Sequence, residues 1–211
     1  DTNMFEGILF IGDVHFDSRR VGRRIDDYTQ AVLDKLDFCA RLAQEKRLLP
    51  VCLGDLFNRH GENHLPSLNR LIDVLRRFPV PMKVLSGSHD RQGAWMSETD
   101  ALSLLHSLSI IEAVDTTCIQ SIEINGGPVS LCFVPHGQVI ADRFDTHGVG
   151  ILVTHHDLGF KGLYPGAQPL KPVEGIRLWI NGHMHTRTDA VEFDSFTAYN
   201  PGSLVRPSVD L

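Results

Sequence analysis

Aspartate and histidine, whose side chains together suit borderline divalent metals, occur in five short motifs of this chain. The motifs are Asp13-Val14-His15, Gly54-Asp55-Leu56-Phe57-Asn58, Gly87-Ser88-His89-Asp90, His155-His156 and Gly182-His183-Met184-His185. Imidazole and carboxylate ligands favour ions such as Mn, Fe or Zn, and no single motif supplies enough of them. The five motifs together predict a metal centre assembled from distant parts of the chain.

Each motif follows directly after an apolar run that is typical of a β-strand. These runs cover residues 8–11, 51–53, 83–85, 150–153 and 178–180. A lone Asp-x-His or His-x-His is usually a coincidence, whereas five such motifs in order, each at a strand end, are specific. Because layered α/β folds bind ligands at the carboxyl ends of their strands, we expect the motifs to meet at one edge of the fold.

The spacing within the motifs suits two cations rather than one. Asp55 follows a glycine, which permits a tight turn where a strand ends, so its carboxylate can bridge two ions. His183 and His185 can reach different ions from one loop. Two cations about 3.5–4 Å apart polarise a phosphoryl oxygen and activate a water for in-line attack. The pattern therefore predicts hydrolysis of a phosphate ester.

The rest of the chain alternates helical and strand-like segments. Apolar spacing predicts helices over residues 25–43, 65–78 and 98–108, and a hairpin of strands over 118–124 and 129–134. A βαβαβ first half and a strand-rich second half predict two packed sheets with helices outside. We expect one domain over residues 1–211, with the Gly- and Pro-rich loop 159–173 overhanging the site.

The five motifs in this order resemble the calcineurin-like metallophosphoesterase superfamily, from Asp13 to the turn that ends at Ser203. The superfamily pattern is DxH, GDxxN or GDxxD, GNH followed by D or E, a lone His and then GHxH. The resemblance implies an α/β fold, a four-layer αββα sandwich of two mixed β-sheets flanked by helices. It also implies two divalent metal ions, with Mn as the first expectation and Fe, Zn or Co as alternatives.

By this resemblance, the two ions share one carboxylate. The first ion would be held by Asp13, His15, Asp55 and His185. The second ion would be held by Asp55, His155 and His183. His155 is preferred to His156 because the first histidine after the strand usually coordinates in the family.

The resemblance also assigns roles to the third motif. His89 would contact the scissile phosphate and stabilise or protonate the leaving oxygen. Asp90 would fix the tautomer of that imidazole and raise its pKa, as a carboxylate partner commonly does. Asn58 is expected to support the loop rather than to bind metal.

Ser88 departs from the family pattern, which has an asparagine whose amide oxygen coordinates the second metal. A serine hydroxyl is shorter and a poorer donor, so it would reach the ion through water. Three explanations remain open: natural variation with a water in the ligand position, an engineered Asn→Ser change, or a naturally attenuated enzyme. The departure concerns the affinity of the second site and not the fold.

The remaining histidines have no motif support and are expected on the surface or in loops. They are His60, His64, His106, His136 and His147. His136 also follows a strand-like run, in Val134-Pro135-His136-Gly137, and is the one to examine first.

Arginines close to the motifs are candidates for binding the substrate. Arg19, Arg20 and Arg23 lie in the loop after His15, and Arg59 follows the second motif. A guanidinium fork matches phosphate oxygens, although the same residues could equally form a solvated start to a helix.

Residues 15–27 and 200–206 look most similar to the DNA-repair exonuclease branch of SbcCD-type nucleases. Members of that branch dimerise, carry a DNA-capping domain and bind an ATPase partner, so a homodimer and a further protein partner are expectations here. The chain ends soon after the phosphoesterase motifs, which fits a truncated piece or a minimal relative. DNA is the first expected substrate, a small nucleotide diester the second and a phosphoprotein the third. The alternative is a weak or inactive relative that only binds phosphate or nucleic acid, a possibility that Ser88 favours.

Composition sets outer limits on the function. A net charge of −6 and a pI near 6.0 argue against a broad basic face for nucleic acid, although several acids are expected metal ligands. No apolar run approaches the roughly 18 residues needed to span a bilayer, and no signal-peptide pattern is present. Four well-separated cysteines without a CxxC spacing are typical of reduced thiols in a cytoplasmic protein.

Overall fold

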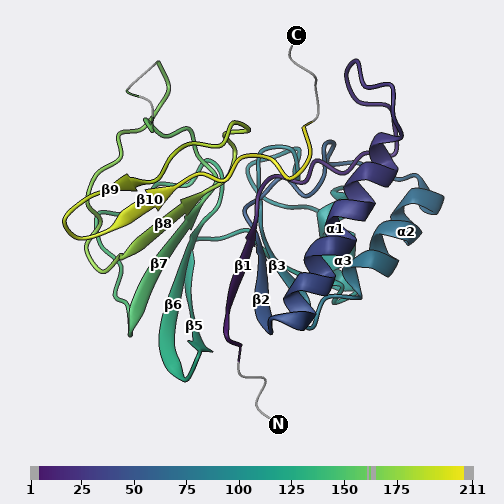
Figure 1. Ribbon diagram of the computed structural model, residues 1–211. Coiled ribbons are helices and arrows are strands. Elements are labelled where there is room, and N and C mark those ends of the chain that lie inside the picture. Colours follow the sequence, from purple (N-terminus) through teal and green to yellow (C-terminus); the bar gives the residue numbers. More distant parts are fainter. Residues whose placement is uncertain (1–4, 161, 163–164, 207–211) are drawn as a thin grey trace.

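Two β-sheets lie face to face in the computed structural model, which describes residues 5–160, 162 and 165–206 (Figure 1). The first sheet is wholly parallel, and its order is β1 (Gly7–Ile11), β2 (Leu48–Cys52), β3 (Met82–Leu85), β4 (Ile111–Val114). The second sheet is mixed, and its order is β5 (Cys118–Ile124), β6 (Gly127–Val134), β7 (Val149–Thr154), β8 (Leu178–Asn181), β10 (Thr197–Tyr199), β9 (Val191–Glu192).

Three helices cover the outer face of the first sheet: α1 (Tyr28–Glu45), α2 (Leu65–Leu75) and α3 (Ala101–Ser107). Helix α1 begins three residues later than the apolar spacing predicts because Asp27 caps it, its side chain accepting a hydrogen bond from Gln30 N. Ile25, which the spacing placed in the helix, is 97% exposed in the preceding loop.

The core between the sheets follows the alternation of the strands. In β2, Val51 faces the second sheet while Cys52 faces the helices. In β6, Leu131 and Phe133 face the first sheet while Cys132 faces outward. Strands β2, β6 and β7 are buried on both faces along most of their length, which explains why they read as apolar runs, whereas β5 alternates half-buried and exposed residues.

Loops rather than helices cover the outer face of the second sheet. Trp179 on β8 and Leu152 on β7 are buried there beneath Leu158, Val173 and Phe196, which all lie outside the strands. The predicted α/β fold of two packed sheets is therefore confirmed, with two corrections. The first sheet is parallel rather than mixed, and among the described residues no helix flanks the second sheet, because the crossovers between its parallel strands are irregular.

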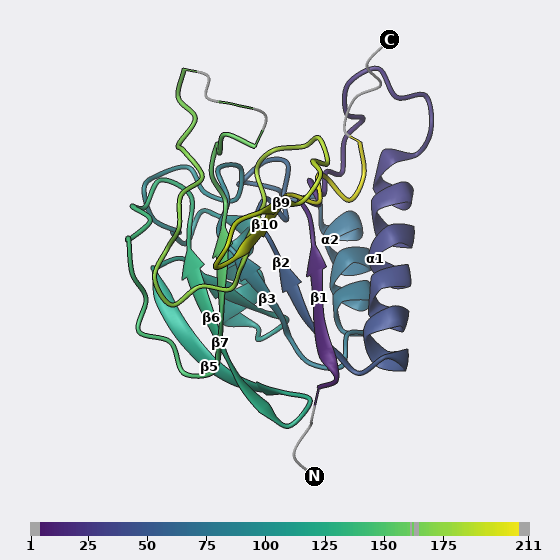
Figure 2. The ribbon, with the colours of Figure 1, turned by 60° about the vertical axis from the view of Figure 1, so that its left-hand side comes forward.

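The strands that precede the five motifs end at the same edge of the molecule, where the loops gather in Figures 1 and 2. They are β1, β2 and β3 of the first sheet and β7 and β8 of the second. The parallel pairing of β1 with β2, of β2 with β3 and of β7 with β8 fixes this common direction. The predicted gathering of the motifs follows directly from this topology. The predicted overhang of loop 159–173 falls partly on residues 161, 163 and 164, outside the described residues, and stays a prediction.

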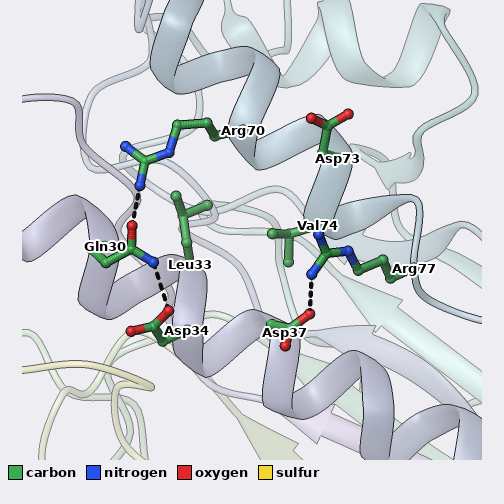
Figure 3. Close-up of a pocket in the computed structure, with 8 residues that line it drawn as sticks. All are labelled: Gln30, Leu33, Asp34, Asp37, Arg70, Asp73, Val74 and Arg77. Carbon is green, nitrogen blue, oxygen red and sulfur yellow. Dashed lines mark hydrogen bonds and ion pairs between the residues drawn. The ribbon is translucent and has the colours of Figure 1, made fainter.

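A charged groove of about 250 Å³ lies between α1 and α2 on the helical face (Figure 3). Its two guanidinium groups are already engaged, Arg70 with Gln30 and Arg77 with Asp37. Such exposed polar contacts contribute little to stability individually. The groove is therefore explained by the packing of the two helices.

All four cysteines are free, as expected; Cys39, Cys52 and Cys132 are buried and Cys118 is half-buried. Burial raises the pKa of Cys132 to about 12, so that side chain stays a neutral thiol. Among the described residues, no helix has both the length and the apolar character to cross a membrane.

The sheet-to-sheet core makes a first prediction about stability. Leu131 is fully buried between the sheets, so Leu131→Ala should lower the free energy of unfolding by about 2–5 kcal/mol. Val139 is 87% exposed, and Val139→Ala should change the free energy of unfolding by less than about 0.5 kcal/mol. Urea denaturation of both variants measures the difference, and equal losses would contradict the assignment of the core.

Candidate metal centre

The loops after β1 and β2 stay paired beyond the strands, and this brings the first two motifs together. Val14 N and His15 N both donate to Asp55 O, at 3.1 and 2.8 Å, and Phe16 N donates to Leu56 O at 2.8 Å. The sequence predicts that the motifs lie at strand ends. The structure adds that the backbones of the first two motifs remain hydrogen-bonded to each other beyond β1 and β2.

Three of the expected ligands adopt left-handed backbone conformations that non-glycine residues rarely take. They are His15 (φ 51°), Asp55 (φ 50°) and His183 (φ 69°). Such conformations persist only where the surroundings fix them, and they concentrate at functional sites. For His15, one fixing contact comes from helix α1, where the buried Tyr28 hydroxyl donates to His15 O at 2.7 Å.

The first ligand cluster contains Asp13, His15, Asp55 and His185, which each offer one ligand atom within 4.8 Å of the others. The Nε2 atoms of His15 and His185 lie 2.8 Å apart. Asp13 Oδ2 lies 3.7 and 3.6 Å from these two nitrogens, and it is buried without a hydrogen-bond partner in the structure. A buried carboxylate oxygen left unpaired among imidazole nitrogens fits a divalent cation well. This set is the one that the resemblance implies for the first ion.

The second ligand cluster contains His136, His155 and His183, again with one ring nitrogen from each within 4.8 Å of the others. His155 is fully buried, and its Nδ1 donates to Leu53 O at 2.8 Å, which leaves Nε2 directed at Asp55 Oδ2, 3.2 Å away. His155 and His183 are expected members. His136 is not, and its expected place in a loop outside the site is corrected.

Asp55 joins the two clusters. Its Oδ1 accepts a hydrogen bond from His89 N at 2.8 Å, which fixes the orientation of the carboxylate. Its Oδ2 lies 3.8 Å from His15 Nε2 in the first cluster and 3.2 Å from His155 Nε2 in the second. The carboxylate is therefore placed to bridge two cations, as the sequence predicts.

The charges of Asp55 and His155 depend strongly on each other. Burial alone would raise the pKa of Asp55, but the imidazoles of His155 and His15 overcome this and hold the pKa well below its usual range. Burial likewise opposes a charge on His155, yet the Asp55 carboxylate raises the pKa of that imidazole to about 9. Without metal the two side chains form a buried ion pair, and a cation bound here would replace the proton on His155.

Two motif glycines leave room for this arrangement. A Cβ atom at Gly87 would lie 2.2 Å from Asp55 Oδ1, and one at Gly182 would lie 2.4 Å from Leu53 O. Neither close approach could accommodate a side chain without movement of the backbone. The glycines of the Gly-Ser and Gly-His motifs therefore have a steric reason.

Ser88 lies beside the bridging carboxylate, its Oγ donating to Asp55 Oδ2 at 3.4 Å. It also lines an open pocket of about 360 Å³ together with His136 and Trp95. The hydroxyl therefore faces the second cluster, in the place that the family gives to a longer amide.

His89 stands at the exposed rim of the first cluster, its ring edge-on to His15 with the centroids 5.1 Å apart. Its Nδ1 donates to Asn58 O at 3.0 Å, which leaves Nε2 free to act on a ligand. Asp90 does not contact this ring, which corrects the role expected for that carboxylate. The fully buried Asp90 accepts from Phe57 N and Gly87 N, both at 2.9 Å, and so ties two motif loops together. Burial and the charge of Asp55 raise the pKa of Asp90 to about 7.

His156 points away from the metal ligands. Its Nε2 donates to Gln138 O at 2.8 Å, and its backbone N donates to Asn181 Oδ1 at 3.1 Å. Burial lowers the pKa of His156 to about 4, so the ring is neutral. This geometry agrees with the preference for His155.

Two buried asparagines support the motif loops and were not predicted as site residues. Asn181 donates to His156 O and Gly182 O, and Asn200 donates to Met184 O and Thr186 O. Both are fully buried, so these bonds fix the carbonyls of the loops that carry His155, His183 and His185. The Asn-Pro-Gly-Ser turn marked Asn200 in the sequence as part of the family pattern. The sequence did not indicate that its side chain donates to carbonyl oxygens of the loop that carries His185.

The arginines expected to bind substrate differ in their surroundings. The Arg59 guanidinium is engaged by Asp17 at 2.9 Å and Glu62 at 3.0 Å, so it braces the loops instead of standing free for phosphate. This corrects its expected role. Arg19, Arg20 and Arg23 are exposed, and their contact with substrate stays a prediction.

The Tyr28 contact makes a prediction about the first ion. Tyr28→Phe leaves His15 O without its buried donor and should cost about 1–3 kcal/mol of unfolding free energy. It should also weaken binding of the first metal ion, because the left-handed conformation of His15 is less well fixed. Tyr199→Phe is the matched control, since that hydroxyl has no hydrogen-bond partner among the described residues. Thermal melts and metal titration measure both effects, and identical behaviour of the two variants would contradict the role of Tyr28.

The Asp55–His155 pair makes a prediction about pH. The pKa of His155 is about 9 in the folded chain and 6.5 in an unfolded one, so below pH 6.5 the charge on His155 stabilises the metal-free protein fully, as long as Asp55 stays ionised. That stability is lost as the pH rises through about 9. The melting temperature of the metal-free protein should therefore fall between these pH values, while saturating divalent metal should abolish the fall. A metal-free melting temperature that rises over this range would contradict the ion pair.

Known structures similar to this one include several proteins that act on nucleotides. The chain aligns with a putative 5′-nucleotidase from Staphylococcus aureus at 13% identity and a TM-score of 0.54, over 92% of this chain and 48% of that one. It aligns with the NAD nucleotidase of Haemophilus influenzae at 14% identity and a TM-score of 0.51, over 93% and 50%. It also aligns with GAP50, an anchor in the inner membrane complex of Plasmodium, at 14% identity and a TM-score of 0.54, over 92% and 70%.

At these identities the similarity shows the fold alone, and the chain spans about half the length of the two nucleotidases. No curated protein sequence gives a significant match. The family model of the calcineurin-like phosphoesterases matches residues 7–187, which include all five motifs. The chain therefore belongs to the calcineurin-like phosphoesterase family.

Proposed function

We propose that this chain is a two-metal phosphodiesterase that acts on a nucleotide-containing substrate, with nucleic acid as the first candidate. The observation that carries the proposal is the position of Asp55 Oδ2, 3.8 Å from a nitrogen of the first cluster and 3.2 Å from one of the second. When bound on either side of this carboxylate, two cations would supply charge for the phosphoryl transition state and a water of lowered pKa.

His89 is the residue best placed to handle the leaving group. Its ring lies at the solvent-exposed rim beside His15, and Asn58 O fixes the proton on Nδ1. When the ring is protonated, Nε2 can donate to the departing oxygen, which is general-acid catalysis. A protein that only bound phosphate would have no need for such a donor, so this geometry favours an enzyme over a binding module.

The pocket beside the second cluster supports a substrate with a base attached. Trp95 lines it and is 57% exposed, and stacking on an aromatic ring is a sequence-tolerant way to bind a base. Arg91 also lines the pocket, but Asp115 and two carbonyl oxygens already engage its guanidinium. The pocket therefore suits an aromatic group better than a further phosphate.

A nucleic-acid strand and a free nucleotide both offer a phosphate to the metal centre and a base to Trp95. The resemblance to SbcCD-type exonucleases rests on motif residues alone, whereas the similar solved structures include nucleotidases. The net charge of −6 argues against a broad basic surface for a duplex. A strand end entering the pocket, with few phosphates contacted, fits these observations. Manganese as the native metal, a cytoplasmic location, a homodimer and a further protein partner stay predictions from the sequence.

Activity assays test the function directly. With Mn²⁺, the protein should hydrolyse end-labelled single-stranded DNA and bis-p-nitrophenyl phosphate, and EDTA should abolish both activities. His89→Ala should lower kcat by about 10²–10⁴-fold, the usual contribution of a general acid. His147→Ala, a change at an exposed histidine, is the control.

Substrate choice is resolved in the same experiment. Trp95→Ala should raise KM for DNA and leave hydrolysis of the small aryl diester unchanged. Turnover of mononucleotides alone would replace the diesterase proposal with a nucleotidase. If no phosphate ester reacts, even after Ser88→Asn restores the amide of the family pattern, the enzyme proposal fails.

A further inference from the structure

We infer that His136 is a ligand of the second metal ion and takes the coordination position that the family gives to the asparagine replaced here by Ser88. The inference rests on the proposed two-metal centre and adds a residue that no motif contains. On this inference the second site does not lack a ligand at Ser88, because His136 on a neighbouring loop supplies one in place of the asparagine.

The backbone of His136 is held firmly at the edge of the centre. It follows β6, which pairs with β7, the strand that directly precedes His155. His136 N donates to Ser86 O at 3.2 Å, directly before the Gly87-Ser88 motif. The Arg91 guanidinium donates to His136 O and is itself paired with Asp115 at 3.1 Å.

The ring of His136 is prepared for coordination in the same way as that of His155. Its Nδ1 lies 3.1 Å from His155 O. Because a carbonyl oxygen only accepts, the proton must be on Nδ1, and Nε2 carries the lone pair. That Nε2 has no hydrogen-bond partner among the described residues. An imidazole whose other nitrogen donates to a backbone carbonyl is the usual arrangement of a metal-binding histidine.

The neighbouring rings complete the geometry. The His136 centroid lies 5.3 Å from that of His183 and 5.8 Å from that of His155. One nitrogen from each ring falls within 4.8 Å of the others. With Asp55 Oδ2 beside His155, the second site has three imidazoles and one carboxylate. Four such donors are a sufficient set for a borderline divalent ion.

Ser88 alone does not explain the second site. Its hydroxyl reaches Asp55 Oδ2 only at 3.4 Å, the outer limit of a hydrogen bond. An imidazole nitrogen is a better donor to borderline metals than a neutral hydroxyl. Exchange of an amide oxygen for an imidazole should also shift the preference of the second site away from Mg²⁺ and towards Mn²⁺, Co²⁺ or Zn²⁺.

Metal binding, rather than turnover, tests the inference. The metal-free protein is titrated with Co²⁺ and with Mn²⁺, following the Co²⁺ visible absorption and the Mn²⁺ electron paramagnetic resonance signal. Wild type should bind two ions. His136→Ala should bind the first ion normally and the second at least on the order of 10–100-fold more weakly, the loss found even when only a supporting partner of a ligand is removed. The Co²⁺ absorption of the second site should be weaker in His136→Ala than in wild type at the same Co²⁺ concentration.

Matched variants separate a ligand from a structural residue. His147 lies in the same crossover between β6 and β7, and His147→Ala should leave both affinities unchanged. His136→Gln keeps a side chain that can donate to His155 O, and it should fold like wild type yet still bind the second ion weakly. Adding Ser88→Asn to His136→Ala should restore part of the second affinity, because it returns the amide ligand of the family.

Other results would overturn the inference in distinct ways. Two ions bound by His136→Ala with wild-type affinity would show that His136 is not a ligand, and a raised KM in that variant would make it a substrate contact. Two ions bound by wild type without hydrolysis would end the proposed function and leave the ligand assignment intact. A single ion bound by wild type would overturn both.

Discussion

The buried carboxylate of Asp55 is the constraint on which the rest of the structure depends. Removing a charge from water is costly unless opposite charges and hydrogen bonds surround it. Here Oδ1 is satisfied by His89 N, and Oδ2 faces His15 on one side and His155 on the other. Those partners come from three different motifs and follow strands of both sheets, so the charge that would hold the metals also joins the loops of the two sheets.

The strands and the motif ligands could be predicted because both depend on local sequence. Strands buried on two faces read as apolar runs, and parallel pairing sends the carboxyl ends within a sheet to one edge, which brings Asp13 and Asp55 together. The start of α1 was placed too early for a local reason as well: Asp27 caps the helix, and the spacing of apolar residues does not register a cap.

What the sequence did not show depends on contacts between distant segments. His136 belongs to no motif, and only the pairing of β6 with β7 brings it to His155. Asp90 follows His89 directly, which suggested that they interact, but its side chain turns inward to two backbone amides. Arg59, which follows the second motif, is engaged by Asp17 and Glu62 instead of standing free for phosphate. In each case the partner lies on another loop, beyond the reach of spacing rules.

The loops on the outer face of the second sheet give the centre two unlike halves. Asp13 and Asp55 follow strands that are backed by three helices. His155 instead begins the crossover from β7 to β8, whose Leu158 and Val173 pack over Trp179, and His183 follows β8. Helix-backed elements resist local opening, while loop-covered ones open at lower free energy. Changes in that crossover can therefore reshape what approaches the second ion without disturbing the scaffold of the first. The side of the centre that would hold the first ion is therefore the more constrained one, and the side of the second ion tolerates more change in its covering loops.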